Sequence, residues 1–158
     1  MGLGASLGPA ARHLELAARL LARHGRMLAT SRIWSSPPAG GVATGRFLNA
    51  AVLLATPLGL LELLDACQDI EARLGRVRAR RWADRTVDLD LLWSPGLQCR
   101  LPALVLPHPR LAERSFAIGP LLDLVPDATP PGGGPSYALL ADRARPLAAP
   151  VAALSTPV

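Results

Sequence analysis

Two aspartates stand inside an otherwise apolar run in the segment RWADRTVDLDLLW, residues 81–93. Residues 86–93 of this run are expected to form a β-strand, and alternate residues of a strand share a face. Asp88 and Asp90 therefore point to one side of the strand, and the apolar residues around them point to the other. A buried carboxylate is costly unless it is paired or bound to a metal. The fold must therefore place a core on one face of this strand and solvent or a cation on the other.

The other elements follow from hydrophobic spacing and from the prolines and glycines that interrupt it. In the first half of the chain we expect a helix over 10–24 ended by Gly25, a strand over 27–35, a loop over 35–45 and a strand over 47–56. A helix over 57–74, capped by Thr56 and ended by Gly75, and a basic loop over 75–85 should follow. Beyond the aspartate strand we expect a loop with short helical pieces over 106–128 and a short helix at 137–144. The strand over 47–56 is apolar on both faces, which is typical of a central strand.

A first strand around Leu3 completes the order strand, helix, strand, loop, strand, helix, strand. This order predicts an α+β fold, a ferredoxin-like sandwich with a mostly antiparallel sheet and two helices on one face. Only three residues precede Gly4, so the first strand is expected to be short or truncated. No linker separates a second domain.

All 17 basic residues of the 158-residue chain are arginines. The absence of lysine excludes a phosphate-binding Walker lysine, Schiff-base chemistry and a lysine general base. A phosphate would have to be bound by guanidinium groups. A GC-rich genome would account for the same composition. The first residues lack the pattern of a signal peptide, and no apolar run reaches the ~20 residues that a bilayer requires, so we expect a cytoplasmic protein.

Five arginines lie within the ten residues that precede and enter the aspartate strand: Arg76, Arg78, Arg80, Arg81 and Arg85. Arginines beside paired aspartates are expected where a metal–triphosphate is held. Carboxylates roughly 6–7 Å apart along a strand can bind one or two hard cations such as Mg²⁺. Two alternatives stay open. The arginines could belong to a salt-bridged surface loop, and the aspartates could lie on the solvent-facing side of an edge strand.

The segment GRVRARRWADRTVDLDLLW, followed by LPHPRLAERSF, resembles the 6-hydroxymethyl-7,8-dihydropterin pyrophosphokinase family of the folate pathway. The segments SSPPAGG, FLNAAV and CQDIEARLGR extend the resemblance over residues 2–128. It implies that ATP donates its β,γ-pyrophosphoryl group to the pterin hydroxymethyl group and releases AMP. It also implies a catalytic domain over 1–128, with the Pro/Gly/Ala-rich residues 129–158 as a C-terminal extension of the same domain.

The resemblance further implies roles for individual residues. Asp88 and Asp90 would bind two Mg²⁺ ions, and Arg85 would join them as a catalytic group. The residues expected to contact ATP are Gln68, Glu71, Arg76, Trp82, Arg85, His108 and Arg114. The residues expected to contact the pterin are Pro37, Phe47, Asn49 and Phe116.

Part of this expectation is supported by the residues themselves. Phe47 and Asn49 share a strand face, and an aromatic ring beside an amide is suited to bind a flat heterocycle with polar edges. Packing of Phe47 in the core is an equally good reading of that strand. The chain departs from the family at Gly4-Ala5-Ser6, where the family has Gly-Ser-Asn, and at Asp84, where the family has proline or a small residue.

Two alternatives to this function are considered, followed by the expected oligomeric state and partners. A catalytically impaired homologue that binds pterin or ATP stays open. A small RNA-binding module also stays open, although the FLNAAV strand lacks an exposed aromatic pair of the kind that stacks on bases. We expect a monomer with small-molecule substrates, and no nucleic-acid or membrane partner.

Overall fold

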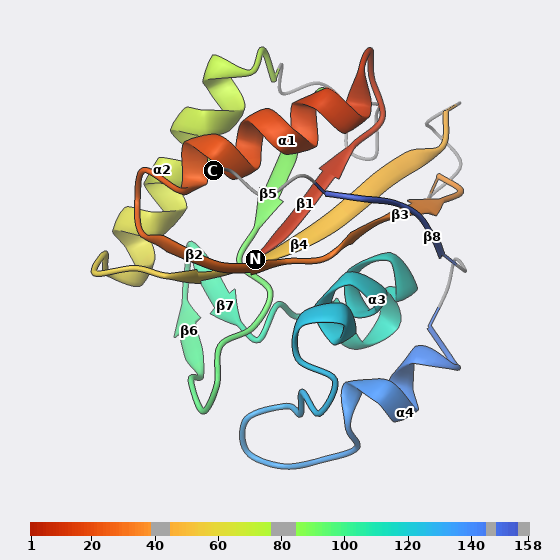
Figure 1. The fold of residues 1–158 in the computed structure, drawn as a ribbon. Coiled ribbons are helices and arrows are strands. Elements are labelled where there is room, and N and C mark those ends of the chain that lie inside the picture. Colours follow the sequence, from red (N-terminus) through yellow and green to blue (C-terminus); the bar gives the residue numbers. More distant parts are fainter. Residues whose placement is uncertain (39–44, 77–84, 145–147, 155–158) are drawn as a thin grey trace.

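The structure is a computed structural model that describes residues 1–38, 45–76, 85–144 and 148–154. Its main sheet has six strands in the order β5-β1-β4-β3-β8, and β2 also pairs with β4 (Figure 1). All of these pairings are antiparallel. The strands of the sheet are β1 (Gly2–Ala5), β2 (Arg26–Thr30), β3 (Arg32–Ser36), β4 (Phe47–Ala55), β5 (Asp88–Asp90) and β8 (Ala149–Ala153). As predicted for an apolar strand, β4 has neighbours on both of its edges.

Two helices cover one face of this sheet (Figure 1). The helix α1 (Ala10–Leu21) follows β1, and α2 (Leu60–Arg73) follows β4. With β5, β1, β4 and β3 side by side, this connectivity is the predicted ferredoxin-like α+β sandwich, which is confirmed. The first strand is short, at four residues, but all four pair with β4 on one side, and Gly2, Leu3 and Gly4 pair with β5 on the other.

The hydrophobic core lies between the sheet and these two helices. It includes Leu14, Ala17, Ala18 and Leu21 of α1, Leu63, Cys67 and Ile70 of α2, and Leu3, Ala5, Val52, Val87, Leu89 and Leu91 of the strands and their ends. Residues alternate between the two faces of a strand. Gly2 and Gly4 of β1, and Asp88 and Asp90 of β5, therefore face away from this core.

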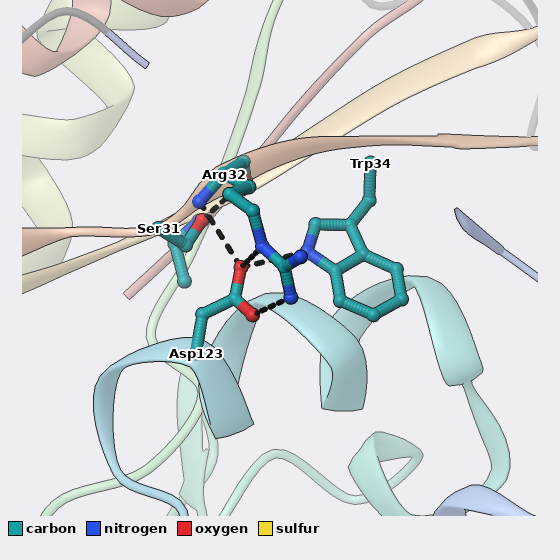
Figure 2. Close-up of polar contacts among 5 residues, drawn as sticks. Ser31, Arg32, Trp34 and Asp123 are labelled. Atoms are coloured by element: carbon teal, nitrogen blue, oxygen red, sulfur yellow. Dashed lines mark hydrogen bonds and ion pairs between the residues drawn. The ribbon is translucent and has the colours of Figure 1, made fainter. Parts of the chain in front are cut away.

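A third long helix, α3 (Ser115–Leu124), covers the opposite face of the sheet and was not predicted there. It approaches closely because residue 119 is glycine, where a Cβ atom would lie 2.7 Å from the ring of Trp34. Its last turn is fastened to β3 by Asp123 (Figure 2). That carboxylate accepts hydrogen bonds from Trp34 Nε1 at 2.9 Å, from the backbone N–H of Arg32 at 3.1 Å and from the Arg32 guanidinium at 2.6 Å.

The strand predicted over 27–35 is divided at Ser31 into β2 and β3. The side chain of Ser31 causes the division because it takes part in the ladder. The backbone N–H of Ser31 donates to Ala51 O at 2.9 Å, as in a regular strand pairing. The backbone N–H of Ala51, however, donates to the side-chain Oγ of Ser31 at 2.8 Å. A hydroxyl thus replaces a carbonyl at this point, and the prediction of one continuous strand was wrong.

The second helix begins three residues later than predicted. The Thr56 hydroxyl does not cap it, because this hydroxyl donates to His24 O at 2.6 Å and accepts from Leu58 N in a tight turn. Gly59 is the N-cap instead, and its N–H donates to the Glu62 carboxylate at 2.7 Å. The predicted end is confirmed, since Gly75 has a φ of +77° just after the last turn.

Two further boundaries differ from the prediction. The first helix ends at Leu21, before Gly25, and Gly25 has a packing role, since a Cβ there would lie 2.4 Å from the carbonyl oxygen of Ala55. The aspartate strand is only three residues long, because β1 offers few residues to pair with it. Most of the basic loop expected over 75–85 lies outside the described residues.

The rest of the chain forms short elements. It consists of the hairpin β6 (Cys99–Leu101) and β7 (Leu104–Leu106), the 3₁₀ turn η1 (Leu111–Glu113), α4 (Tyr137–Ala141) and the edge strand β8. The Tyr137 side chain of α4 is buried against α3, and β8 pairs with β3. Within the described ranges, no helix has the length and apolar character needed to span a membrane.

Candidate active site

A cavity of about 320 Å³ opens on the face of the sheet that α3 covers, between the strands β1, β4 and β5 and the beginning of α3. Ten of the thirteen site residues expected from the sequence line it: Pro37, Phe47, Asn49, Arg76, Arg85, Asp88, Asp90, His108, Arg114 and Phe116. They come from five separate parts of the chain. The size is at the lower end of the range for small-molecule sites.

The three other expected residues do not line the cavity. Trp82 lies outside the described residues. Gln68 is exposed on α2. Glu71 is only 5% exposed and lies behind the cavity wall, in contact with Arg76. The predicted contacts of these three residues with ATP stay predictions.

The two aspartates stand on the floor of the cavity because of the strand period. Val87, Leu89 and Leu91 are buried in the core, and Asp88 and Asp90 point the opposite way, as predicted. Across β1 they lie opposite Gly4 and Gly2. A glycine neighbour keeps the floor open, since a Cβ at Gly4 would lie 3.4 Å from Asn49 Oδ1.

Asp88 is held between two arginines. Its two carboxylate oxygens pair with the guanidinium of Arg76 and with that of Arg85. Arg76 also pairs with Glu71, and the other bond of the Glu71 carboxylate is accepted from the backbone N–H of Leu89 at 2.8 Å. Burial raises the pKa of Glu71, although the Leu89 hydrogen bond and Arg76 oppose this rise. Glu71 therefore ties α2 to β5 and anchors one arginine of the site.

Asp90 differs from Asp88 in that no described residue forms a hydrogen bond or an ion pair with its carboxylate. Burial, and after it the negative charge of Asp88, raise the pKa of Asp90 to about 6. The positive charge of Arg114 opposes this rise. The floor of the cavity thus carries a carboxylate with which no described residue forms an ion pair.

His108 is positioned by the backbone on both sides. The backbone N–H of His108 donates to Leu92 O at 2.7 Å. The ring Nδ1 of His108 accepts from the backbone N–H of Arg110 at 3.2 Å. Burial lowers the pKa of His108, and the charges of Arg114 and Arg110 lower it further. The ring is therefore neutral at pH 7. Since Nδ1 accepts a hydrogen bond, the proton lies on Nε2, which can donate to a ligand.

The aromatic part of the cavity lies between β4 and the first turn of α3. Phe47 belongs to β4 and Phe116 to α3, and the guanidinium of Arg114 lies 5.6 Å from the centre of the Phe116 ring. Between them, the Asn49 side chain is 6% exposed. Its Nδ2 donates to Ser36 Oγ at 3.1 Å, which sets the orientation of the amide.

Ser36 was missed by the sequence analysis as a site residue. It is 1% exposed, lines the cavity and fixes Asn49. The only signal for it was its place directly before Pro37 in the segment SSPPAGG, and a serine in a proline-rich loop gives no indication of its partner.

Similarity to known proteins covers most of the chain. The family model for 7,8-dihydro-6-hydroxymethylpterin-pyrophosphokinase matches residues 1–126. Three relatives carry the name 2-amino-4-hydroxy-6-hydroxymethyldihydropteridine pyrophosphokinase. The relative from Methylorubrum extorquens is 43% identical over 129 residues, which are 80% of this chain and 82% of the relative. The relative from Bacillus subtilis is 38% identical over 126 residues, which are 78% and 75% of the two chains.

The third relative, from Pseudomonas aeruginosa, is 44% identical over 108 residues, which are 68% of this chain and 67% of the relative. The matched residues include the cavity described above, since every residue that lines it lies between positions 2 and 117. The sequence pattern, the fold and these similarities agree, and the chain belongs to the 7,8-dihydro-6-hydroxymethylpterin-pyrophosphokinase family.

Proposed function

We propose that the two ends of the cavity divide the two substrates between them, with the triphosphate of ATP at the aspartates and the pterin at the phenylalanines. As a member of its family, the chain is an ATP-dependent pyrophosphokinase. It transfers pyrophosphate from ATP to 6-hydroxymethyl-7,8-dihydropterin in folate biosynthesis, giving the pterin diphosphate and AMP. The hydroxymethyl oxygen attacks the β-phosphorus, and the bond from this phosphorus to the α,β-bridging oxygen breaks. The observation that carries the division is the presence of carboxylates and arginines at one end and aromatic rings at the other.

The donor set on the cavity floor fits magnesium. Carboxylate oxygens are the ligands Mg²⁺ prefers, and it usually keeps several positions for water and substrate phosphates. In agreement with that, the described residues contain no cluster of three or more histidine, cysteine or acidic side chains that could enclose a metal by themselves. The raised pKa of Asp90 supports the same reading, because a cation would compensate its charge. We assign Asp88 and Asp90 as ligands of two Mg²⁺ ions that are bound together with ATP.

When bound, Mg²⁺ supplies charge neutralisation at the phosphate oxygens. The chain's own residues supply the rest. The guanidinium groups of Arg76 and Arg85 pair with Asp88 in this structure, and phosphate oxygens are the alternative anions with which they can pair. Arg85 is assigned the catalytic role, because it lies next to the aspartates and can bind charge as it develops on the leaving AMP.

His108 and Arg114 are assigned to the triphosphate as well. A neutral imidazole with its proton on Nε2 can donate one hydrogen bond to a phosphate oxygen without repelling the nearby arginines. The positively charged guanidinium of Arg114 adds a second contact with the negatively charged phosphates. Neither residue is assigned a proton-transfer role, because the pKa of His108 is lowered and the ring keeps its proton on Nε2 at neutral pH.

Pro37, Phe47, Asn49 and Phe116 are assigned to the pterin. Two aromatic rings from different elements can stack on the two faces of a flat heterocycle. This stacking is favourable whatever polar groups the heterocycle carries on its edge. The edge is read by the Asn49 amide, whose Oδ1 is left for a ligand when Nδ2 donates to Ser36. The stack and the amide together favour a heterocycle with hydrogen-bond donors on one edge.

We assign residues 129–158 to the same domain as 1–128, which is supported by the burial of Tyr137 against α3 and by the pairing of β8 with β3. We also expect the enzyme to act as a monomer in the cytoplasm.

Incubation of the protein with ATP, Mg²⁺ and 6-hydroxymethyl-7,8-dihydropterin tests the function directly. The products are separated by chromatography and identified by their phosphorus spectra. We expect AMP and the pterin diphosphate in equal amounts. Formation of ADP would contradict transfer of a pyrophosphoryl group, and binding of both substrates without any product would establish the catalytically impaired alternative.

A further inference from the structure

The end of β1 holds the backbone of Arg85 by three hydrogen bonds. The backbone N–H groups of Ser6 and Leu7 donate to the carbonyl oxygen of Arg85 at 3.0 and 3.1 Å. In return, the N–H of Arg85 donates to Ser6 Oγ at 3.1 Å. Both backbone polar groups of Arg85 are thus bound by one short segment, and one of these bonds depends on a side chain.

This contact lies just beyond the paired part of β1 and β5. The last pair in the ladder is Gly4 with Asp88, so the strands themselves do not fix residue 85. From its fixed backbone, the Arg85 guanidinium reaches Asp88 three residues further on. Ser6 is not among the described residues that line the cavity, whereas Arg85 is.

We propose that Ser6 is a positioning residue for pyrophosphoryl transfer, whose hydroxyl fixes the backbone of Arg85 and thereby the place of its guanidinium beside Asp88. The inference rests on the proposed catalytic role of Arg85. An arginine has a long side chain with many rotamers, so its placement depends on how well its backbone is held. Losing the hydroxyl removes its bond with the Arg85 N–H, so that only the two bonds to the Arg85 carbonyl oxygen hold this segment, which precedes β5, to the residues after β1.

The residue type at position 6 agrees with this role. Serine and asparagine both carry a side-chain oxygen that can accept a hydrogen bond from a backbone N–H. Alanine cannot, and it is otherwise the closest in size to serine.

A double-mutant cycle of Ser6→Ala and Arg85→Ala tests the proposal, with kcat and both KM values measured under saturating Mg²⁺. We expect Ser6→Ala to lower kcat about 10-fold, a smaller loss than the ~10²-fold expected when the arginine itself is removed, because a misplaced group retains part of its effect. In the Arg85→Ala background, Ser6→Ala should lower kcat no further, because the group through which Ser6 acts is gone.

Two further variants separate positioning from folding. Ser6→Asn keeps an acceptor and should restore most of kcat. Ser136→Ala is the matched control, because the Ser136 hydroxyl also accepts from a backbone N–H, that of Leu139, but far from the cavity. It should change the thermal midpoint without changing kcat.

The outcomes are distinguishable. An unchanged kcat in Ser6→Ala, or an equal loss in the wild-type and Arg85→Ala backgrounds, would overturn the role of Ser6. An unchanged kcat in Arg85→Ala would instead refute the catalytic role of Arg85 on which the inference rests.

Discussion

Replacing Asp123 with alanine tests how α3 is held against the sheet. This helix carries Phe116 in its first turn, and Asp123 fastens its last turn to β3 through Trp34 and Arg32 (Figure 2). The side chain of Arg32 is 56% exposed, so its ion pair is expected to contribute little. The more shielded bond is that from Trp34 Nε1.

Loss of the charged acceptor for that shielded N–H costs ~1.5–3 kcal/mol. We therefore expect Asp123→Ala to lower the free energy of unfolding by about 2 kcal/mol at pH 7. Burial opposes ionisation of Asp123, but the hydrogen bonds from Arg32 and Trp34 outweigh it and lower the pKa of this carboxyl. Its stabilising effect is then complete above the unfolded pKa of about 3.9 and is lost as the pH falls through the folded value.

Urea denaturation at a series of pH values measures both effects. The difference between the wild type and Asp123→Ala should be constant near neutral pH and should shrink below about pH 4. Asp127→Ala is the matched control, because Asp127 is exposed and no described residue is seen to donate a hydrogen bond to it. If Asp123→Ala is no more destabilising than this control, or if the difference grows at low pH, the attachment of α3 described here is wrong.

Two other predictions concern the substrates. Phe116→Ala should raise the KM for the pterin ~10-fold and leave the KM for ATP nearly unchanged, because a stacked aromatic contributes ~1–3 kcal/mol to binding a flat ring; equal losses for both substrates in steady-state kinetics would indicate a structural phenylalanine. Mg²⁺ added without ATP should bind weakly in isothermal titration, because Arg76 and Arg85 already pair with Asp88. Removal of one competing ion pair in Arg85→Ala should then tighten the binding of Mg²⁺ alone about fivefold, and an unchanged or weaker affinity would contradict this competition.

The sequence was sufficient for the parts of the site that depend on local periodicity. Asp88 and Asp90 face the cavity because a strand alternates its side chains, and the same rule places Phe47 and Asn49 together on β4. The central position of β4 followed from its apolar faces. These features need no knowledge of distant contacts.

The parts that depend on distant contacts could not be predicted. The segment of α3 is apolar on all sides and contains Pro120, so its pattern did not indicate a ten-residue helix or the face it covers. Its attachment joins Asp123 to Arg32, 91 residues away. The contacts of Glu71 with Arg76 and with the backbone of Leu89 depend on how α2 packs against β5.

The most direct test of the central claim is the rate of AMP formation in Asp90→Asn, measured beside Asp88→Asn with ATP, Mg²⁺ and the pterin. Asparagine keeps the shape of the side chain and removes the negative charge with which a cation would be held. We expect each variant to fold like the wild type by circular dichroism and to lose at least ~10²-fold in kcat, the scale of one well-placed electrostatic group. Wild-type turnover in Asp90→Asn would contradict the assignment of this carboxylate as a magnesium ligand.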